Sequence, residues 1–505
     1  MCALSMSSNS RIEQSHQQLF QMLGPLLIQS DKAYLVGGLV RDSLLGCIPR
    51  DLDIAVSGDA SAVARSITKV LGGNLVVMDE ARNYFRVVLR EESRLDTIRT
   101  IDVSALYGDI FQDLARRDFT IDAMAVPLHN YLSGNWRESI IDPCNGLRDL
   151  ELGLIRATGT EVFLEDSLRA LRAVRLVAQL GFAIEEDTRD SIQRHAGAIQ
   201  DISSERLRDE LLAILAAPGA SSSLYLMDEL GLLLMVIPEL DQGRGVTQPK
   251  EHYWDVFRHN IETVAAVEGL LERNLTPAWI LDEVPWDDYL KKHFQEISSD
   301  GHSRATLCKL TGLLHDIAKP ATKTVEPSGK IRFLGHNRIG ADMASAILQR
   351  LRLSGKGVEM VQLMVDLHMR PGQMSQNVEI PTPRAIYRYF RRAENVAIDT
   401  IFLNLADYVA ARGPYLQHAE WVAYAGMVRH ILEVGLFQDE AVTQSRILDG
   451  HTLIKHLSLS SGPLVGRLLN IVKEAQAAGE IGTEEEAINL ARKQMKTFHK
   501  EGVHA

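Results

Sequence analysis

The sequence has few cysteines and no long apolar segment. Its 505 residues include only Cys2, Cys47, Cys144 and Cys308, and no two of them form a CxxC pair. This spacing excludes a zinc ribbon or a disulfide framework and fits a reducing compartment. The longest apolar runs, such as LGLLLMVI, are too short to span a bilayer, and residues 1–18 lack the pattern of a secretory signal. We therefore expect a cytoplasmic protein that does not bind membranes.

The chain also lacks an excess of positive charge. It carries 54 Lys and Arg against 66 Asp and Glu, a net charge of −12. This balance argues against broad binding of polyanions but permits a local basic groove. There are no internal repeats or low-complexity tracts. The length and the 46% apolar content predict a globular protein of several domains.

The pattern of residues changes along the chain. The segments AYLVGG, DLDIAV, NLVVMD, YFRVVLR and TIRTIDVSAL, all before residue 110, are predicted strands. Later segments are mostly helical, and the polar stretch at 272–304 is predicted to be a loop or insertion. We expect an α+β head at 1–150, an all-α neck and body at 151–244, an all-α domain at 245–440 and a small helical tail at 441–505.

The segment VGGLVRDSLLG is the first candidate binding site. Gly37 and Gly38 follow a predicted strand and precede an amphipathic helix. Glycines there let the backbone approach a ligand, and the start of a helix favours phosphate. Arg41 adds a guanidinium suited to phosphate oxygens. Taken alone, this pattern is more typical of a tight structural turn than of a phosphate site.

Two carboxylates follow on the predicted strand DLDIAV. Asp51 and Asp53 are two residues apart, so their side chains point to the same face of a sheet. They repel each other unless a cation lies between them, although a solvated strand edge would also tolerate the pair. Together with the glycines, they predict two-metal phosphoryl transfer. Asp102 is either a third carboxylate of this site or an ordinary surface residue.

The segment EDSLRALRAVRL is a candidate for reading a nucleobase. Asp166 and Arg169 are predicted to be neighbours on one face of a helix, while Leu168, Leu171 and Val174 form a stripe that can pack inward. A carboxylate accepts hydrogen bonds and a guanidinium donates them. The pair therefore suits the amine and ring acceptor of cytosine or adenine, and not guanine or uracil. A salt bridge on a solvated helix face is the alternative.

Five segments in a fixed order carry a family resemblance. They are GGLVRDSLLGCIPRDLDIAV, RRDFTIDAMA, DPCNGLRDLELGLIRA, EDSLRALRAVRLVAQLGF and SSERLRDEL. They resemble the five motifs of the class II tRNA nucleotidyltransferases, which include the CCA-adding enzymes and bacterial poly(A) polymerases. The resemblance implies a polymerase-β-like head in which Asp51 and Asp53 hold Mg²⁺ and Asp102 is a further catalytic candidate. The nucleotide-binding candidates it implies are Gly37, Gly38, Arg41, Asp42, Arg116, Arg117, Asp118, Asp166, Arg169, Arg172 and Arg175.

Histidines and carboxylates recur in the second half of the chain. Any one of these histidines alone is more typical of a core or surface position. The whole set, with its His-Asp doublet, resembles the all-helical HD superfamily of metal-dependent phosphohydrolases. Imidazole and carboxylate suit Mn, Ni or Co, which would activate a water against a phosphate ester. The candidate ligands are His259, His315, Asp316, His336, His368 and Asp407.

Some positions depart from the family pattern. Asp122 and Asn145 stand where the family usually has Asn and Gly. Only residues 107–115 separate the last predicted strand from RRDFT. CCA-adding relatives usually have a longer flexible loop there, which helps the switch from C to A, and CC-adding members lack it.

The preferred interpretation is a template-independent tRNA nucleotidyltransferase that adds CMP and AMP from CTP and ATP to the tRNA 3′ end, with the helical tail contacting tRNA. The nearest alternatives are a CC-adding enzyme and a poly(A) polymerase. A phosphohydrolase whose head only binds RNA, and a protein that senses CTP or ATP without incorporating it, are alternatives of a different class.

Overall fold

The computed structural model describes residues 22–24, 32–47, 49, 51–90, 98–133, 136–275, 277–374, 380–444 and 447–500. The expectation on residues 1–18 lies outside this range. The chain divides into two compact units, Met1–Ile202 with Leu226–Val236, and Ser203–Tyr225 with Ile237–Ala505. No helix among the described residues is long and apolar enough to cross a membrane.

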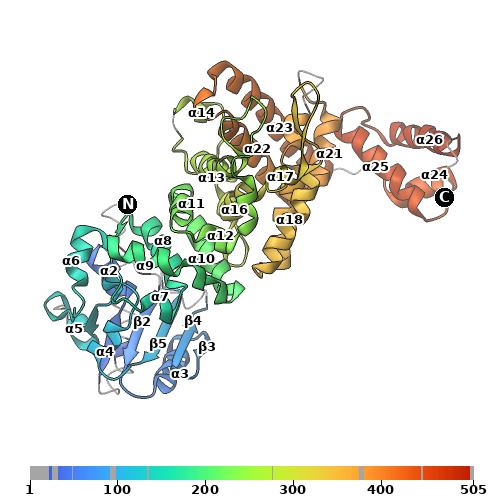
Figure 1. The fold of residues 1–505 in the computed structure, drawn as a ribbon. Helices are drawn as coiled ribbons and strands as arrows, with labels where there is room; N and C mark the ends of the chain where they lie inside the picture. The colour runs from blue at the N-terminus through green and yellow to red at the C-terminus, as the bar shows by residue number, and fades with distance from the viewer. Residues whose placement is uncertain are drawn as a thin grey trace. The chain divides into compact units, whose positions relative to one another are not determined.

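A mixed six-stranded sheet forms the centre of the first unit, with the strand order β3-β4-β5-β2-β1-β6 (Figure 1). Neighbouring strands are antiparallel except β2 and β5, which run parallel. The five predicted strands are confirmed, while β6 is too short for its alternation to be recognised in sequence. The strands are β1 (Ala33–Val36), β2 (Asp51–Val56), β3 (Asn74–Asp79), β4 (Tyr84–Val88), β5 (Thr100–Ala105) and β6 (Ala125–Pro127).

The two faces of this sheet differ in what covers them. On one face, helix α3 (Ala60–Leu71) shares a hydrophobic cluster with Leu52, Ile54 and Val103 of β2 and β5. On the other face, α4 (Ile110–Ala115) packs with Val36 and Ala55. Because side chains alternate along a strand, the residues between those of the first cluster point to the second face. The carboxylates of β2 and β5 therefore share the face on which α4 packs.

Several further short elements complete the first unit. Parallel β7 and β8 form a small separate pair. The elements are α2 (Gly38–Leu44), η2 (Thr120–Asp122), α5 (Leu128–Ser133), η3 (Trp136–Ser139), α6 (Gly146–Leu152), β7 (Leu154–Ile155), α7 (Val162–Glu165), α8 (Arg169–Leu180), β8 (Ala183–Ile184), α9 (Glu186–His195), η4 (Ala196–Asp201) and α12 (Leu233–Val236). Helix α11 (Ala220–Glu229) runs from the second unit into the first.

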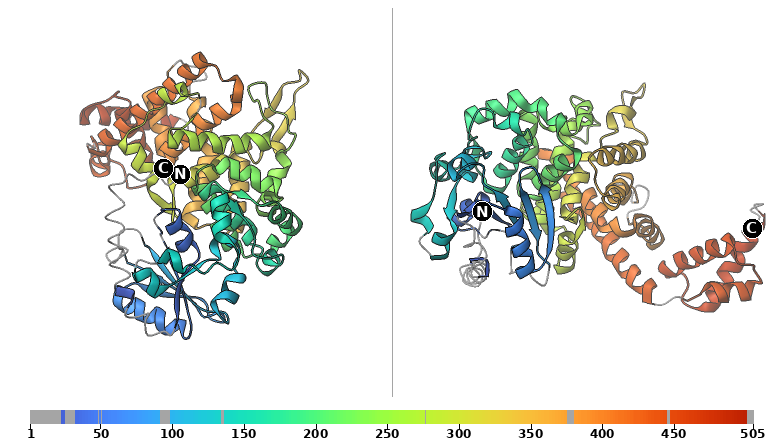
Figure 2. Two further views of the ribbon diagram at one scale, coloured as in Figure 1. Left: turned by 90° about the vertical axis from the view of Figure 1, so that its left-hand side faces the viewer. Right: turned by 90° about the horizontal axis from the view of Figure 1, so that it is seen from below.

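The second unit is mostly helical, as predicted (Figure 2). It also contains two hairpins, β9 (Ile297–Ser299) with β10 (His302–Ser303) and β11 with β12. Helix α13 packs against α16 and α22, and α18 packs against α19. The main helices are α10 (Ser204–Ala216), α13 (Val256–Glu272), α16 (Arg304–Leu314), α18 (His336–Arg350), α19 (Gly355–Leu367), α21 (Pro383–Ala393), α22 (Ala397–Arg412) and α23 (His418–Gln444). The shorter elements are η5 (Pro238–Gly243), α17 (Lys319–Thr322), β11 (Lys323–Val325), β12 (Ile331–Phe333), α20 (Arg370–Gln373), η6 (Glu394–Val396) and η7 (Gly413–Tyr415).

The predicted helical tail is confirmed as three helices with their own hydrophobic cluster. They are α24 (Gly450–Leu457), α25 (Pro463–Ala477) and α26 (Glu484–Lys500). Leu453, Leu468 and Ala491 are fully buried between them.

Two segments predicted as loops contain regular structure. The stretch at 272–304 includes α14 (Trp279–Asp282), α15 (Asp288–Gln295), β9 (Ile297–Ser299) and β10 (His302–Ser303). Its apolar residues Ile280, Leu290 and Phe294 are buried, which its polar composition concealed. In residues 107–115, Asp109 caps α4 by accepting from the Gln112 amide at 2.9 Å. A local cap is strong enough to order such a short segment.

The turn into α6 generates a stability prediction. A Cβ on Gly146 would overlap the Thr120 carbonyl oxygen and lie 3.1 Å from Met124 Cγ. Because the first obstacle is backbone, we expect Gly146→Ala to destabilise the first unit by about 1–3 kcal/mol. The matched control is Gly159→Ala, where nothing lies within 4 Å of the added carbon. Thermal unfolding should show a lower Tm for the first variant and not the second, and equal Tm values would contradict the packing argument.

Candidate active sites

Asp51 and Asp53 lie on the face of the sheet that packs with α4. Asp53 pairs with Asp102 across the parallel strands, and exposed Asp51 accepts a hydrogen bond from Thr100 Oγ1 at 2.6 Å. Gly37 precedes α2 with φ +70°, where a Cβ would lie 3.1 Å from Asp53 Oδ2 and 2.9 Å from Arg117 Nη1. Glycine is therefore needed for the backbone to approach this carboxylate and this guanidinium together.

The environment of Asp53 is unfavourable for its charge. Burial raises the pKa of Asp53 to about 6, Asp102 and Asp51 add to the increase, and Arg117 opposes it. A divalent cation between Asp51 and Asp53 would relieve this repulsion. The donor set consists of carboxylate oxygens, which hard divalent ions prefer, so the site fits such an ion.

Asp102 shares the site's face but is already paired. Its oxygens accept from Arg86 Nε and Nη2, each at 2.7 Å, and from Tyr84 Oη at 2.6 Å. The sequence analysis missed Tyr84 and Arg86, although their alternation with buried Phe85 and Val87 places them on this face. Asp102, the third carboxylate, therefore lies next to Asp53, and its charge is neutralised by Arg86 of the neighbouring strand β4.

Arg41 is buried in ion pairs with carboxylates. Its Nε and Nη2 lie 2.8 Å from Asp42 Oδ1, and its Nη1 lies 2.6 Å from Asp122 Oδ1. Gly38 opens α2 beside it, with a virtual Cβ 3.2 Å from Arg41 Nη2. The expected phosphate contact of Arg41 is thus not available to most of its N–H groups in this arrangement. The acidic residue at position 122, where the family usually has Asn, supplies one of these partners.

The RRD segment, Arg116 to Asp118, lies between α4 and η2. The Arg116 guanidinium lies 4.0 Å above the Tyr107 ring. Arg117 Nη2 is 3.4 Å from Asp113 Oδ2, while its Nε is buried and has no hydrogen-bond partner among the described residues. An unsatisfied buried donor beside Gly37 is suited to an anionic ligand.

Asp118, the last residue of RRD, is buried and pairs with α8. Its Oδ2 lies 3.1 Å from Arg172 Nη1. Burial favours a high pKa for this carboxyl, but Arg172 and Arg169 outweigh it and hold the pKa of Asp118 below its usual value. Asp118 thus links RRD to α8, on which Arg175 is half-buried.

Asp166 and Arg169 are not on one helix, so that prediction is wrong. Asp166 is extended, with φ −153°, and α8 begins at Arg169. The cause is local, since Asp166 Oδ1 accepts from the Leu168 amide at 3.2 Å, as Asp does in turns. The two residues remain neighbours in this turn, where the Arg169 amide donates to Asp166 O at 3.1 Å.

The Arg169 side chain is held by backbone groups on both sides. Nη1 donates to Val162 O and Nη2 to Arg116 O, each at 3.1 Å. Leu168, Leu171 and Val174 are buried, as predicted. Arg169 is therefore oriented by α7 and by Arg116 of RRD.

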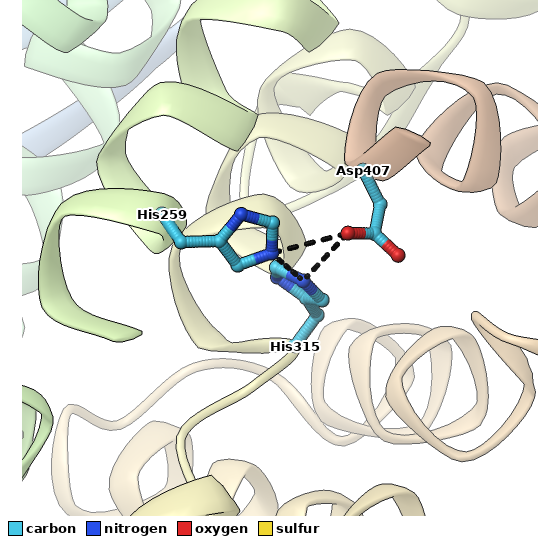
Figure 3. A group of neighbouring side chains, drawn as sticks. All are labelled: His259, His315 and Asp407. Atoms are coloured by element: carbon cyan, nitrogen blue, oxygen red, sulfur yellow. Dashed lines mark hydrogen bonds and ion pairs between the residues drawn. The ribbon is translucent and has the colours of Figure 1, made fainter. Parts of the chain in front are cut away.

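The second candidate site gathers six residues that lie in or directly after five helices of the second unit: α13, α16, α18, α19 and α22. Figure 3 shows His259 of α13, His315 at the end of α16 and Asp407 of α22 directed toward one another. His259 Nε2 lies 3.2 Å from His315 Nε2 and 3.1 Å from Asp407 Oδ1. Asp316 Oδ2 is 3.2 Å from each of the two histidine Nε2 atoms. All six predicted metal ligands come together here, with His336 and His368 completing the set.

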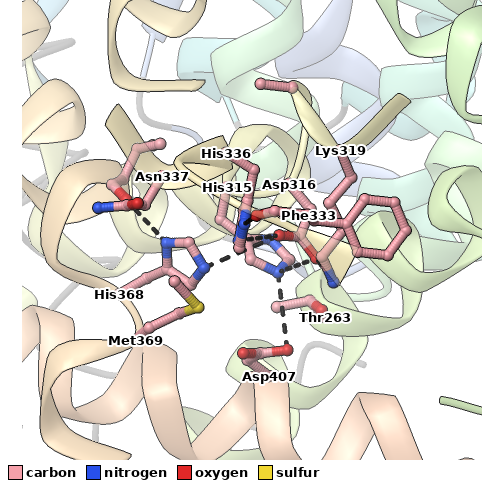
Figure 4. Close-up of polar contacts among 12 residues, drawn as sticks. Thr263, His315, Asp316, Lys319, Phe333, His336, Asn337, His368, Met369 and Asp407 are labelled. Atoms are coloured by element: carbon pink, nitrogen blue, oxygen red, sulfur yellow. Dashed lines mark hydrogen bonds and ion pairs between the residues drawn. The ribbon is translucent and has the colours of Figure 1, made fainter. Parts of the chain in front are cut away.

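The imidazoles are oriented by main-chain carbonyls. Figure 4 shows His336 and His368 facing Asp316, with Nε2–Oδ1 distances of 3.3 and 3.8 Å. The Nδ1 atoms of His315, His336 and His368 each donate to a carbonyl three residues earlier, at 2.7–2.8 Å. Because Nδ1 carries the proton, the Nε2 lone pairs are available to a metal.

The electrostatics of this centre fit a divalent cation. Burial lowers the pKa of His368 to about 3. Burial also disfavours protonation of His315, but Asp316 and Asp407 reverse this and raise its pKa to about 10. Buried His336 Nε2 has no hydrogen-bond partner among the described residues. Carboxylate and imidazole atoms directed at one point, with so little solvent, are typical of a metal centre.

The sequence analysis missed two residues beside this centre. Lys319 Nζ lies 2.5 Å from Asp316 Oδ2 and 3.3 Å from His252 Nε2. Its position three residues after Asp316, at the start of α17, was a readable signal. No sequence pattern pointed to His252, because this residue lies in the loop before α13.

The fold and the two sites define a class of protein: a nucleotidyltransferase head on a mixed sheet, followed by a helical region with an HD-type metal centre. Family comparisons agree. The "Poly A polymerase head domain" matches residues 33–156, the "Probable RNA and SrmB-binding site of polymerase A" matches 181–243, and the "HD domain" matches 289–412. His259 lies before the matched HD residues.

Two relatives resemble nearly the whole chain, and a third resembles part of it. An A-adding tRNA nucleotidyltransferase of Deinococcus radiodurans is 33% identical, over 93% of this chain and 97% of the relative. A CC-adding tRNA nucleotidyltransferase of Thermus thermophilus is also 33% identical, over 90% of this chain and 92% of the relative. A CCA-adding enzyme of Geobacillus kaustophilus is 37% identical over 40% of this chain and 50% of the relative's length. The chain belongs to the tRNA nucleotidyltransferase family.

Solved structures confirm the predicted fold. A CCA-adding enzyme of Thermotoga maritima complexed with tRNA aligns over 95% of each chain, with 23% identity and a TM-score of 0.58. A complex of a CCA-adding enzyme with CTP aligns over 95% of each chain, with 22% identity and a TM-score of 0.59.

The geometry of the histidine centre predicts which residue matters most for holding a metal. Asp316 contacts all four histidines, so Asp316→Asn should weaken the binding of a divalent metal more than about tenfold. The measurement is the metal content of protein loaded with MnCl₂ and then dialysed. Asp342→Asn, an exposed carboxyl on α18, is the control and should retain as much metal as the wild type. Retention by both variants would show that this cluster is not the metal site.

Proposed function

We propose that this enzyme transfers CMP and AMP from CTP and ATP to the 3′ end of tRNA without a template. The observation that carries the proposal is the face of the sheet where Asp51, Asp53 and Asp102 meet Gly37 and Arg117. The names of the relatives, A-adding and CC-adding tRNA nucleotidyltransferases, support tRNA as the substrate. The tail would contact the tRNA. The division of the chain into four domains, at 1–150, 151–244, 245–440 and 441–505, is part of this proposal.

In this reaction the tRNA 3′ hydroxyl attacks the α-phosphate in line and pyrophosphate leaves. Asp51 and Asp53 would hold Mg²⁺, which neutralises charge on the phosphates and the attacking oxygen. Gly37 and Gly38 let the triphosphate approach the backbone, and the buried Arg117 Nε is a donor without a partner among the described residues. Asp42 and Asp122 keep Arg41 in place beneath this site.

Selection of the base would use the turn before α8. Asp166 would accept from the exocyclic amine of cytosine or adenine, and Arg169 would donate to the adjacent ring nitrogen. Arg169 is already oriented by Val162 O and Arg116 O, so little freedom is lost on binding. Asp118 and Arg172 would hold α8 against RRD, with Arg175 one turn further along.

Addition of CC alone is the second candidate. The segment 107–115 is short, and its last six residues form α4 (Ile110–Ala115). It therefore does not contain the longer loop that CCA-adding relatives usually have. CC-adding relatives of Thermus thermophilus, Synechocystis and Geobacter sulfurreducens match over at least 90% of this chain. A CC-adding enzyme would depend on a partner for the final A.

We propose phosphate-ester hydrolysis at RNA ends as a second activity, at the histidine centre. Mn, Ni or Co would be held by the six ligands and would supply an activated water. The paired geometry of Asp51 and Asp53 argues against a head that only binds RNA or only senses nucleotides. A tRNA substrate and the free cysteines Cys47, Cys144 and Cys308 suit the cytoplasm.

Incubation with radiolabelled tRNA ending at the discriminator base tests the main proposal. We expect growth by two nucleotides with CTP and by a third only when ATP is also present. Growth that stops at two would identify a CC-adding enzyme, and a long ladder with ATP a poly(A) polymerase. No growth would leave only the histidine centre as the catalyst.

The double variant Asp51→Ala, Asp53→Ala should lower nucleotide addition about a thousandfold, because it removes both metal-holding carboxylates. Asp316→Asn is the matched control, since it changes a carboxylate of the histidine centre and should leave addition unchanged. Addition that survives the double variant would exclude the head as the catalyst.

The raised pKa of Asp53, about 6, predicts a pH dependence of Mg²⁺ binding. Above pH 6 the carboxyl is already ionised, whereas below pH 6 it must lose a proton before it binds metal. The Mg²⁺ affinity, measured by calorimetry with a non-hydrolysable CTP analogue, should therefore fall about tenfold per pH unit below 6. Asp187→Asn, an exposed carboxyl on α9, should give the wild-type curve. A constant affinity from pH 7 to 5 would contradict the assignment.

A further inference from the structure

The histidine centre is most exposed to solvent at Asp407. The side chains of His259, His315, Asp316 and His368 are at most 1% exposed, whereas Asp407 is 21% exposed. His336 is also nearly buried, with 6% exposed. A phosphate ester that reaches this centre must therefore approach along the Asp407 side of α22.

Aromatic side chains lie near that opening. The carbonyl oxygen of Ala411, one helical turn beyond Asp407, accepts from the Tyr253 amide at 2.7 Å. Four residues of a helix span about 6 Å, so Tyr253 is attached close to the opening. The Tyr253 ring lies 4.4 Å from the Trp254 ring and 5.0 Å from the Tyr415 ring, edge to face in both cases.

These rings are tied to the centre by the loop before α13. His252 immediately precedes Tyr253, and its ring lies 5.3 Å from the ring of the ligand His259. His252 Nε2 is also 3.3 Å from Lys319 Nζ, which contacts Asp316. Two consecutive residues of the loop thus reach the metal ligands and the aromatic cluster.

The aromatic surface is open and flanked by cations. The side chain of Tyr415 is 68% exposed and that of Tyr253 is 43% exposed. Rings that served only to pack the loop against α22 would be buried, so their exposure favours a binding role. The Arg258 guanidinium lies 3.9 Å above the Trp254 ring, and that of Arg412 lies 3.6 Å above the Tyr408 ring. Exposed rings beside guanidinium groups are the combination that binds single-stranded nucleic acid, by base stacking and phosphate contact.

We propose that Tyr253, Trp254 and Tyr415 form a stacking surface for the terminal nucleobase of a single-stranded RNA end, whose phosphate enters the histidine centre past Asp407. Arg258 and Arg412 would contact the preceding phosphates. The proposal rests on the hydrolysis of RNA ends proposed for this centre, and it adds the residues that would favour an RNA end over a phosphate ester without a base.

The test uses the full chain and a short RNA whose last base is 2-aminopurine and which ends in a 2′,3′-cyclic phosphate. Stacking on an aromatic ring quenches 2-aminopurine fluorescence, so binding is seen without hydrolysis. We expect Tyr415→Ala to weaken this binding about tenfold and to remove most of the quenching. We also expect KM for this RNA to rise about tenfold more than KM for bis(4-nitrophenyl) phosphate, a diester without a nucleobase.

Tyr289→Ala is the matched control, because Tyr289 is 55% exposed on α15 and lies outside the proposed surface. This variant should match the wild type for both substrates. Equal effects of Tyr415→Ala on the two substrates, or unchanged quenching, would overturn the stacking proposal. If the wild type hydrolyses neither substrate with Mn²⁺, Ni²⁺ or Co²⁺, the proposed hydrolysis fails, and the quenching alone decides whether the surface binds the base.

Discussion

The repulsion between buried carboxylates is the constraint on which both sites depend. Asp53 faces Asp102 across two parallel strands, and Asp316 and Asp407 face the same histidines. Burying like charges costs free energy unless cations or hydrogen-bond donors compensate. Arg86 and Tyr84 compensate Asp102, whereas the raised pKa of Asp53 shows that its charge is not fully compensated. The protein thereby keeps negative charge in positions where a metal cation would stabilise it.

Each site is built by a different kind of scaffold. In the head, strand alternation puts the carboxylates on one face, and Gly37 allows Arg117 to approach them. In the helical region, Nδ1 bonds to carbonyls within the same helices or turns orient the imidazoles, and helix packing brings them together. A sheet positions neighbours in one strand or in paired strands, while a helical bundle collects residues distant in sequence.

The sequence predicted a large part of both sites. The strands, the shared face of Asp51 and Asp53, and the six residues of the histidine centre are confirmed in position, and their roles remain predictions. Arg86 was missed because its significance depends on β4 pairing with β5, which spacing alone does not reveal. The helix expected to carry both Asp166 and Arg169 was wrong because the Asp side chain bonds the Leu168 amide and the helix starts later.

Local chemistry was thus readable from the chain itself: where strands run, which side chains alternate, and which residue types can hold phosphate or metal. These properties depend on nearest neighbours, whose geometry is set by backbone sterics and side-chain period. Only the tertiary structure decided which of these groups are already neutralised, as Arg41 and Asp102 are. It also decided that Asp407, the most exposed residue of the histidine centre, lies on the helix that holds the loop of Tyr253. Pairing and burial depend on contacts between segments far apart in the sequence, and no local pattern encodes them.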